Sequence, residues 1–245
     1  MKKIITALIL FIFPSFLARC IVRLWGIRIK GRVGFSLVFC EQCEIGPGAV
    51  IQSGSLIRIP ILKMESGAKI RCFSFIRGGF ALLMHEAAVI KPFTKITNAL
   101  RLQYRKIQLE IGKMTIIGIS SRIDMTGNVT IGDYTVFAGA GLEIWTHSYY
   151  HSKIVPKRFR IDGDVVVGNN VYIGSRCILT AGVTIADNIS VGAGSVISKN
   201  LERSGLYVNQ PLRFLEFDPD EKIIAVCEPI PEAPIDLVYR KRSIT

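Results

Sequence analysis

The sequence predicts an all-β solenoid, in which the chain winds into stacked three-sided coils of short parallel strands. Three observations lead to this prediction. A bulky aliphatic residue recurs at every sixth position of the C-terminal half, and each is followed by a small or polar residue such as Gly168 or Thr180. A six-residue period fits neither an α-helix nor a simple alternating strand. Stacked coils bury such an aliphatic column, so no coil is stable alone. The inward positions are Val167, Ile173, Leu179, Ile185, Val191 and Ile197.

The same period continues toward the N-terminus. One set begins at Ile45, a second begins at Ile111 and restarts after a two-residue slip at Ile131, and a looser version covers Met64 to Val89. With about 18 residues in each coil, about seven coils fit between Ile45 and Leu201. A sandwich or barrel of short strands would instead show turn signals at intervals of about 8–12 residues, and this sequence lacks them. The further inward positions are Ile51, Ile57, Ile70, Ile76, Val89, Ile117, Ile123, Val129 and Phe137.

We expect one repeat domain over residues 31–205, preceded by a hydrophobic and basic segment over 1–30 and followed by a cap or tail over 206–245. The apolar N-terminal stretch is similar to a signal peptide, but Arg19 stands where a cleavage site needs a small residue. We expect a helix that lies on a membrane surface or covers the first coil. A tilted transmembrane anchor is the alternative.

The formal net charge of +12 predicts anionic partners. An acidic membrane surface or a phosphorylated cofactor is favoured over nucleic acid, because the basic residues are scattered among the coils. Six cysteines include one CxxC pair, Cys40 and Cys43, but a zinc ribbon needs two such pairs. We therefore expect reduced thiols in a cytosolic protein, and no metal site.

The repeat stops after Glu143 and resumes at Val165. The intervening residues, 144–164, are polar, aromatic and basic, and contain His147 and His151. A long loop inserted into a regular scaffold is typical of a functional site. His147 opens the loop where the coil still holds the backbone, and a neutral imidazole there suits a general base near neutral pH.

The repeats, the loop opening THSYYH and the run VVVGNNVYIGSRCILTAGVTIADNISVGAGSVISKN resemble the hexapeptide-repeat acyltransferases. The most similar branch contains galactoside, maltose and xenobiotic acetyltransferases and bacterial surface-polysaccharide O-acetyltransferases. The resemblance is strong over 129–214 and rests on pattern alone over 27–128. It implies a left-handed parallel β-helix that forms a homotrimer, with acetyl-CoA bound in a groove between neighbouring solenoids.

The resemblance also implies roles for particular residues. His147 matches the catalytic histidine that opens the extended loop. A usual GxP near the nucleotide end reads Asn209-Gln210-Pro211 here, which is a departure from the family pattern. Glu143, four residues before His147, is our hypothesis for a carboxylate that orients the imidazole. The positions that match cofactor-binding residues are Tyr172, Ser175, Ala193, Ser198, Lys199 and Arg213.

These observations predict transfer of an acetyl group from acetyl-CoA to a sugar hydroxyl, in the synthesis of a bacterial capsule or lipopolysaccharide. We expect a cytoplasmic enzyme, peripheral on the inner face of the cytoplasmic membrane. The aromatic residues of the loop, Trp145, Tyr149 and Tyr150, either stack on sugars or pack between subunits.

An N-acetyltransferase acting on an amino-sugar nucleotide is the nearest alternative, and a non-enzymatic scaffold is another. A γ-type carbonic anhydrase would need three histidines around one zinc ion. His85 precedes His147 by 62 residues, which is more than three coils, so these histidines are not expected to converge.

Overall fold

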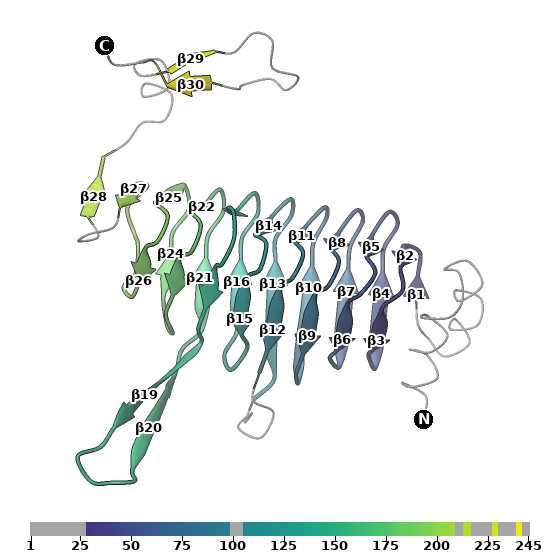
Figure 1. Ribbon diagram of the computed structural model, residues 1–245, viewed down its shortest axis with the longest axis horizontal. Coiled ribbons are helices and arrows are strands. Elements are labelled where there is room, and N and C mark those ends of the chain that lie inside the picture. The colour runs from purple at the N-terminus through teal and green to yellow at the C-terminus, as the bar shows by residue number, and fades with distance from the viewer. Residues whose placement is uncertain (1–27, 99–104, 209–212, 217–226, 230–238, 242–245) are drawn as a thin grey trace.

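The computed structural model describes residues 28–98, 105–208, 213–216, 227–229 and 239–241. Within these ranges three parallel sheets run side by side along a prism, and successive coils supply neighbouring strands of each sheet (Figure 1). The prediction of a β-solenoid with an extended loop is confirmed. The prism has about nine turns, consistent with a left-handed β-helix.

The strands are grouped by sheet. The first sheet contains β1 (Arg28–Ile29), β4 (Gln42–Ile45), β7 (Ile61–Met64), β10 (Phe80–Met84), β13 (Ile107–Ile111), β16 (Val129–Ile131), β21 (Val165–Val167) and β24 (Thr184–Ile185). The second contains β2 (Arg32–Val33), β5 (Val50–Ile51), β8 (Lys69–Ile70), β11 (Val89–Ile90), β14 (Ile116–Ile117), β17 (Val136–Phe137), β22 (Tyr172–Ile173), β25 (Ile189–Val191), β27 (Gly205–Val208) and β28 (Arg213–Leu215). The third contains β3 (Leu37–Phe39), β6 (Leu56–Arg58), β9 (Phe75–Arg77), β12 (Lys95–Thr97), β15 (Arg122–Asp124), β18 (Glu143–Ile144), β23 (Ile178–Leu179) and β26 (Val196–Ile197). Two separate hairpins pair β19 (His147–His151) with β20 (Arg158–Asp162) and β29 (Cys227–Pro229) with β30 (Tyr239–Lys241).

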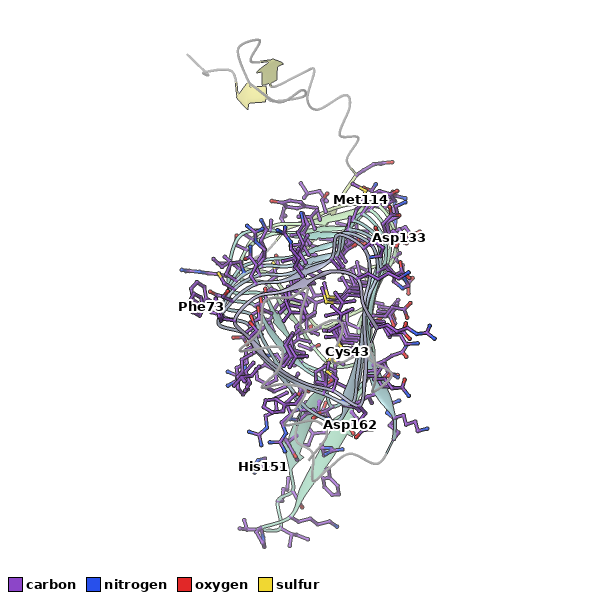
Figure 2. All side chains as sticks on the ribbon, turned by 90° about the vertical axis from the view of Figure 1, so that its right-hand side faces the viewer. Cys43, Phe73, Met114, Asp133, His151 and Asp162 are labelled. Carbon is purple, nitrogen blue, oxygen red and sulfur yellow. The ribbon has the colours of Figure 1, made fainter. Side chains whose placement is uncertain are left out.

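The core is the predicted aliphatic column. Figure 2 looks along the prism and shows Cys43 inside it, with Phe73 and Met114 on the outside. The inward positions predicted for the C-terminal half are all buried to within 1% exposure. One position was predicted wrongly: Val89 is only half-buried, whereas Ile90 points into the core. The six-residue count fails there because the coils of the N-terminal half contain extra residues.

The sheets meet at three corners, and two of them carry the candidate site. We call the turns at 138–142, 174–177 and 192–195 the second corner, because they join the second sheet to the third. We call the turns at 125–128, 145–164 and 180–183 the third corner, because they join the third sheet back to the first. The long predicted loop is therefore an insertion at the third corner.

The ends of the prism differ from the predicted boundaries by a few residues. β1 already pairs with β4 at Arg28, and β27 extends the second sheet to Val208. β28 then runs antiparallel to β27. The predicted N-terminal helix and its membrane contact lie outside the described residues. Among the residues that are described, no helix is long and apolar enough to cross a membrane.

Candidate active site

The insertion at the third corner is an antiparallel hairpin of β19 and β20. It leaves the prism after β18 and returns at β21 (Figure 1). Its return is fixed at Asp164, whose carboxylate accepts hydrogen bonds from the Asn128 backbone at 2.9 Å and from the Asn128 side chain at 3.1 Å, and pairs with Arg105. Burial alone would raise the pKa of Asp164, but the bonds from Arg105 and Asn128 outweigh it and lower the pKa. The base of the hairpin is thus rigidly held.

His147 begins β19 and lies against a carboxylate of the preceding coil. Its Nδ1 is 2.8 Å from Oδ2 of Asp124. The two side chains are 24% and 11% exposed, so the pair is largely shielded while the imidazole still reaches the surface. This arrangement is a histidine oriented by a carboxylate, as expected of a general base.

Two threonines hold the Asp124 carboxylate in place. Thr146 donates its hydroxyl hydrogen bond to Oδ2 at 2.7 Å, and Thr126 donates to Oδ1 at 3.1 Å. The Thr146 hydroxyl in turn accepts bonds from the Thr126 and Gly127 amides. A carboxylate that already accepts these bonds favours Nδ1–H on His147. The lone pair then lies on Nε2, where it can accept a proton from a substrate.

Aromatic rings surround the imidazole. The Trp145 and Tyr149 rings meet it edge-on, with centroids 6.4 Å and 5.7 Å away. The Arg122 guanidinium lies 5.0 Å above the Trp145 ring. These contacts restrict rotation of the His147 side chain, since each neighbour is itself held.

Glu143 does not contact His147. Its carboxylate instead accepts a hydrogen bond from Trp145 Nε1 at 2.8 Å. Residues four apart are neighbours on a helix, but in an extended strand they are separated by about 13 Å at 3.3 Å for each residue. In stacked coils the neighbour of a residue lies one coil away. The structure therefore gives the orienting position to Asp124, which precedes His147 by 23 residues and which our sequence analysis did not propose.

An open pocket of about 270 Å³ adjoins Asp124. It is lined by Asp124 and Trp145 from the site itself and by residues of the two preceding strands of the third sheet. The remaining lining residues are Thr97, Asn98, Arg122 and Ile123. His147 does not line this pocket, so an acceptor there would lie beside Asp124, the partner of the imidazole.

The predicted cofactor residues fall on two corners. Ser175 and Ala193 lie in turns of the second corner, after β22 and β25, and the Gly194 amide donates to the Ser175 carbonyl at 2.8 Å. Gly174 has to be a glycine there, because a Cβ would approach the Ala193 backbone to within 2.5 Å. Tyr172 is half-exposed on β22 beside this corner.

Ser198 and Lys199 are exposed beyond β26, on the same side of the prism as the third corner. Arg213 begins β28. The single chain therefore does not bring all the predicted residues together: His147, Ser198 and Lys199 lie toward one corner, and Tyr172, Ser175 and Ala193 toward the other.

The other histidines and Cys177 do not take part in the contact between His147 and Asp124. His85 lies between Glu65 and Glu110, at 3.1 Å and 2.9 Å, and does not approach His147. His151 is exposed at the far end of β19 (Figure 2). Within the described ranges, no cluster of three or more metal-ligating side chains is arranged to hold an ion. Burial raises the pKa of the Cys177 thiol, which makes it a poor nucleophile.

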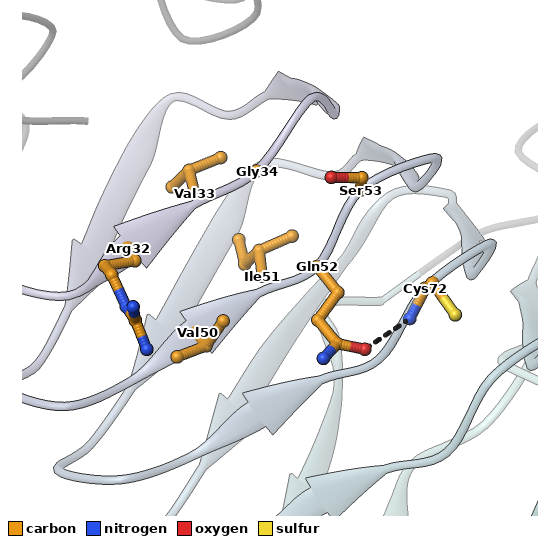
Figure 3. Close-up of a pocket in the computed structure, with 8 residues that line it drawn as sticks. All are labelled: Arg32, Val33, Gly34, Val50, Ile51, Gln52, Ser53 and Cys72. Carbon is orange, nitrogen blue, oxygen red and sulfur yellow. Dashed lines mark hydrogen bonds between the residues drawn. The ribbon is translucent and has the colours of Figure 1, made fainter. Parts of the chain in front are cut away.

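A larger pocket, of about 520 Å³, lies near the opposite end of the prism (Figure 3). It is lined by β2, β5 and the adjoining turns, and Gln52 there accepts a hydrogen bond from the Cys72 amide at 3.2 Å. Its lining residues Arg32, Val50 and Ser53 include no acid–base pair comparable to His147 and Asp124.

Comparison with known proteins identifies the repeat. Residues 164–199 match the family described as Bacterial transferase hexapeptide (six repeats). The predicted resemblance to hexapeptide-repeat acyltransferases is therefore confirmed. The matched segment runs from the end of the hairpin through β26, and it includes five of the six predicted cofactor positions.

Two relatives and one solved structure define the similarity further. A galactoside O-acetyltransferase of Escherichia coli is 33% identical over 93 residues, which are 36% of this chain and 43% of the relative. A bifunctional protein GlmU of Gloeothece citriformis is 30% identical over 176 residues, 68% of this chain but only 33% of the relative. The chain thus spans about a third of the GlmU relatives it matches. The polysialic acid O-acetyltransferase OatWY is 19% identical, with a TM-score of 0.52 over 78% of this chain and 83% of that one, and shares the fold.

Proposed function

We propose that this protein is an acetyl-CoA-dependent O-acetyltransferase that acts on a saccharide hydroxyl. The observation that carries the proposal is the contact between His147 Nδ1 and Asp124 at the base of the hairpin. That contact prepares Nε2 as a base, and an open pocket adjoins Asp124. The hexapeptide-repeat match and the galactoside O-acetyltransferase relative support the reaction class.

His147 acts first as a base and then as an acid. Its Nε2 removes the proton from the acceptor hydroxyl as that oxygen attacks the carbonyl carbon of the thioester. The backbone amide of Ser175 donates to the oxyanion that develops. When the carbon–sulfur bond breaks, the imidazolium returns the proton to sulfur. The products are an O-acetyl ester and CoA with a free thiol, and Asp124 balances the transient charge on the imidazole throughout.

The site needs a neighbouring copy of the chain. Five residues separate Ser175 from Thr180, the two ends of one side of the prism, so an extended strand holds the two corners about 16 Å apart. His147 at the third corner cannot then reach a thioester held at the second corner of the same copy. A homotrimer with parallel prisms brings the third corner of one copy to the second corner of the next. We propose that each acetyl-CoA lies in such a groove.

The remaining cofactor contacts follow from charge and position. Ala193 and Tyr172 lie along the pantetheine arm of acetyl-CoA at the second corner. Its phosphates are bound by Ser198, Lys199 and Arg213. Lysine and arginine suit phosphate because they supply charge and several donors.

The acceptor belongs to a bacterial surface polysaccharide, and the protein works at the inner face of the cytoplasmic membrane. The apolar N-terminal stretch and its basic flank support this location. A lipid-linked sugar would be presented at that surface.

The test compares two histidines of one strand. Purified wild type, His147→Ala and His151→Ala are incubated with acetyl-CoA and a panel of hydroxyl and amino-sugar acceptors, and products are identified by mass spectrometry. His147→Ala should lose transfer by about 100-fold or more while retaining CoA binding, measured as thermal stabilisation. His151→Ala should remain active. Undiminished turnover of His147→Ala would overturn the base assignment, and transfer only to amino groups would favour an N-acetyltransferase.

A further inference from the structure

The third sheet has an uneven distribution of charge on its outer face. Four successive strands, β6, β9, β12 and β15, each place one cation on it: Arg58, Arg77, Lys95 and Arg122. All four side chains are exposed. The later strands β18, β23 and β26 contain no cation. The basic strip, as we call these four residues, therefore occupies only the N-terminal half of this face.

The strip contains two cross-strand pairs of like charge. Arg58 is directly beside Arg77 in the register of β6 and β9, and Lys95 is directly beside Arg122 in that of β12 and β15. Neighbouring strands are only about 4.8 Å apart, and like charges in such positions repel one another. A cross-strand pair of this kind is unfavourable by itself and becomes favourable when an anion lies over it.

No carboxylate in the described residues forms an ion pair with the strip, although Glu143 lies directly beside Arg122 in the register of β15 and β18. Ion pairs are formed by other cations, such as Arg105, Lys113 and Arg160, but by none of the four. The third sheet contains only two carboxylates, and both are engaged: Asp124 by His147 and two threonines, and Glu143 by Trp145. The charges of Arg58, Arg77 and Lys95 are therefore available to a ligand, whereas that of Arg122 already lies over the Trp145 ring and beside Glu143.

The strip ends at the candidate active site. Arg122 lines the pocket beside Asp124 and Trp145, and Lys95 is its neighbour in register. Thr97, which also lines this pocket, lies beside Arg77. An acceptor whose hydroxyl reached His147 would thus place the adjoining part of its chain over Lys95, Arg122 and Arg77.

We infer that the acceptor is an anionic glycan, with carboxylate or phosphate groups that bind the basic strip near the hydroxyl to be acetylated. This inference rests on the proposed function and deepens it. A membrane surface is the competing anionic partner. A glycan is favoured because the strip reaches the pocket beside Asp124, the partner of His147, whereas a flat lipid surface would not need that connection.

The test uses binding, so that it does not depend on turnover. The probes are an oligogalacturonide and the carboxyl-reduced neutral oligomer of equal length, titrated calorimetrically against the full chain. The test variant is Lys95→Gln with Arg122→Gln. The control variant, Lys63→Gln with Lys69→Gln, removes the same charge from exposed positions of the first and second sheets.

We expect the anionic oligomer to bind at least about 10-fold more tightly than the neutral one, and the test variant to lose that difference while the control keeps it. Equal binding of the two oligomers, equal losses in both variants, or no binding at all would overturn the inference. The inference would also be overturned if the test variant no longer sedimented with phosphatidylglycerol vesicles but still bound the oligogalacturonide. If this test fails but His147→Ala has lost activity, only the inference that the acceptor is anionic is refuted. If His147→Ala keeps its activity, the assignment of His147 as the base is refuted.

Discussion

The two halves of the prism are built to different rules. In the C-terminal half Val167 pairs with Ile185, so a coil takes 18 residues, and the first-sheet strand β24 has only 2 residues. In the N-terminal half Ile45 pairs with Met64 and Met64 with Met84, so these coils take 19 and 20 residues, and β10 has 5 residues. The extra residues are added between the third and first sheets. The hairpin with His147 is a larger insertion at that same corner, so the scaffold tolerates additions there and keeps its other two corners nearly constant.

The difference also separates two tasks. The regular half matches the bacterial transferase hexapeptide family and carries most of the predicted cofactor positions. The looser half carries the basic strip and supplies Asp124. We expect the cofactor to depend on the first and the acceptor on the second, with His147 at their junction.

The largest effect should come from removing the carboxylate that the looser half supplies. Asp124→Asn preserves shape but no longer stabilises the imidazolium or fixes the Nδ1–H tautomer, so kcat should fall by about 10²–10⁴-fold. Glu143→Gln, the matched control, should change kcat by less than about 3-fold, since Glu143 contacts Trp145 and not His147. Similar losses in both variants would contradict the assignment of Asp124.

Core substitutions compare the packing of the halves. Ile57 and Ile173 are both fully buried, one in each half. Truncation of either to alanine should cost about 2–5 kcal/mol, measured by urea unfolding, because each leaves a cavity in the same column. A much smaller cost for Ile57→Ala would mean that the core of the N-terminal half is also less tightly packed. It would contradict the view that the two halves differ only in the length of the third corner.

Mixed oligomers test whether the two corners belong to different copies. Inactive His147→Ala and Ala193→Trp chains are unfolded together and refolded. If each site combines the histidine of one copy with the second corner of the next, about a quarter of the sites should regain both parts in a random mixture. Recovery of activity supports the shared groove. Persistent inactivity, with light scattering that shows trimers, would contradict it.

The smallest effect concerns His85 in the looser half. Bonds to Glu110 and Glu65 raise the pKa of His85 above its usual value near 6.5. The folded state therefore holds this proton more tightly than the unfolded state. The stabilisation is complete below about pH 6 and disappears as pH rises through the raised pKa. Unfolding of His85→Gln and wild type at several pH values should differ by less than about 1 kcal/mol, most at low pH. A difference that grew with pH would exclude this assignment.

The fold was predictable from the sequence because the inward residues of a coil recur at every sixth position, and this period is visible in the sequence itself. The prediction lost register at Val89, where the longer coils of the N-terminal half break that count. His147 was predictable because it opens an interruption. Asp124 was not, since its partner lies one coil away and not nearby in the sequence. Alignment of Ile123 with Ile144 across the coils would have shown that Asp124 lies beside Trp145, close to the histidine.

β28 has a consequence for how copies of the prism can associate. A parallel ladder ends in a row of unsatisfied amides and carbonyls, which can be extended by any further strand of the same kind. The backward-running Arg213–Leu215 occupies that row in the second sheet. This strand therefore hinders the end-to-end association of prisms into fibres, but it does not hinder their side-by-side association. A chain that stopped at Val208 should accordingly form filaments more readily than the intact protein.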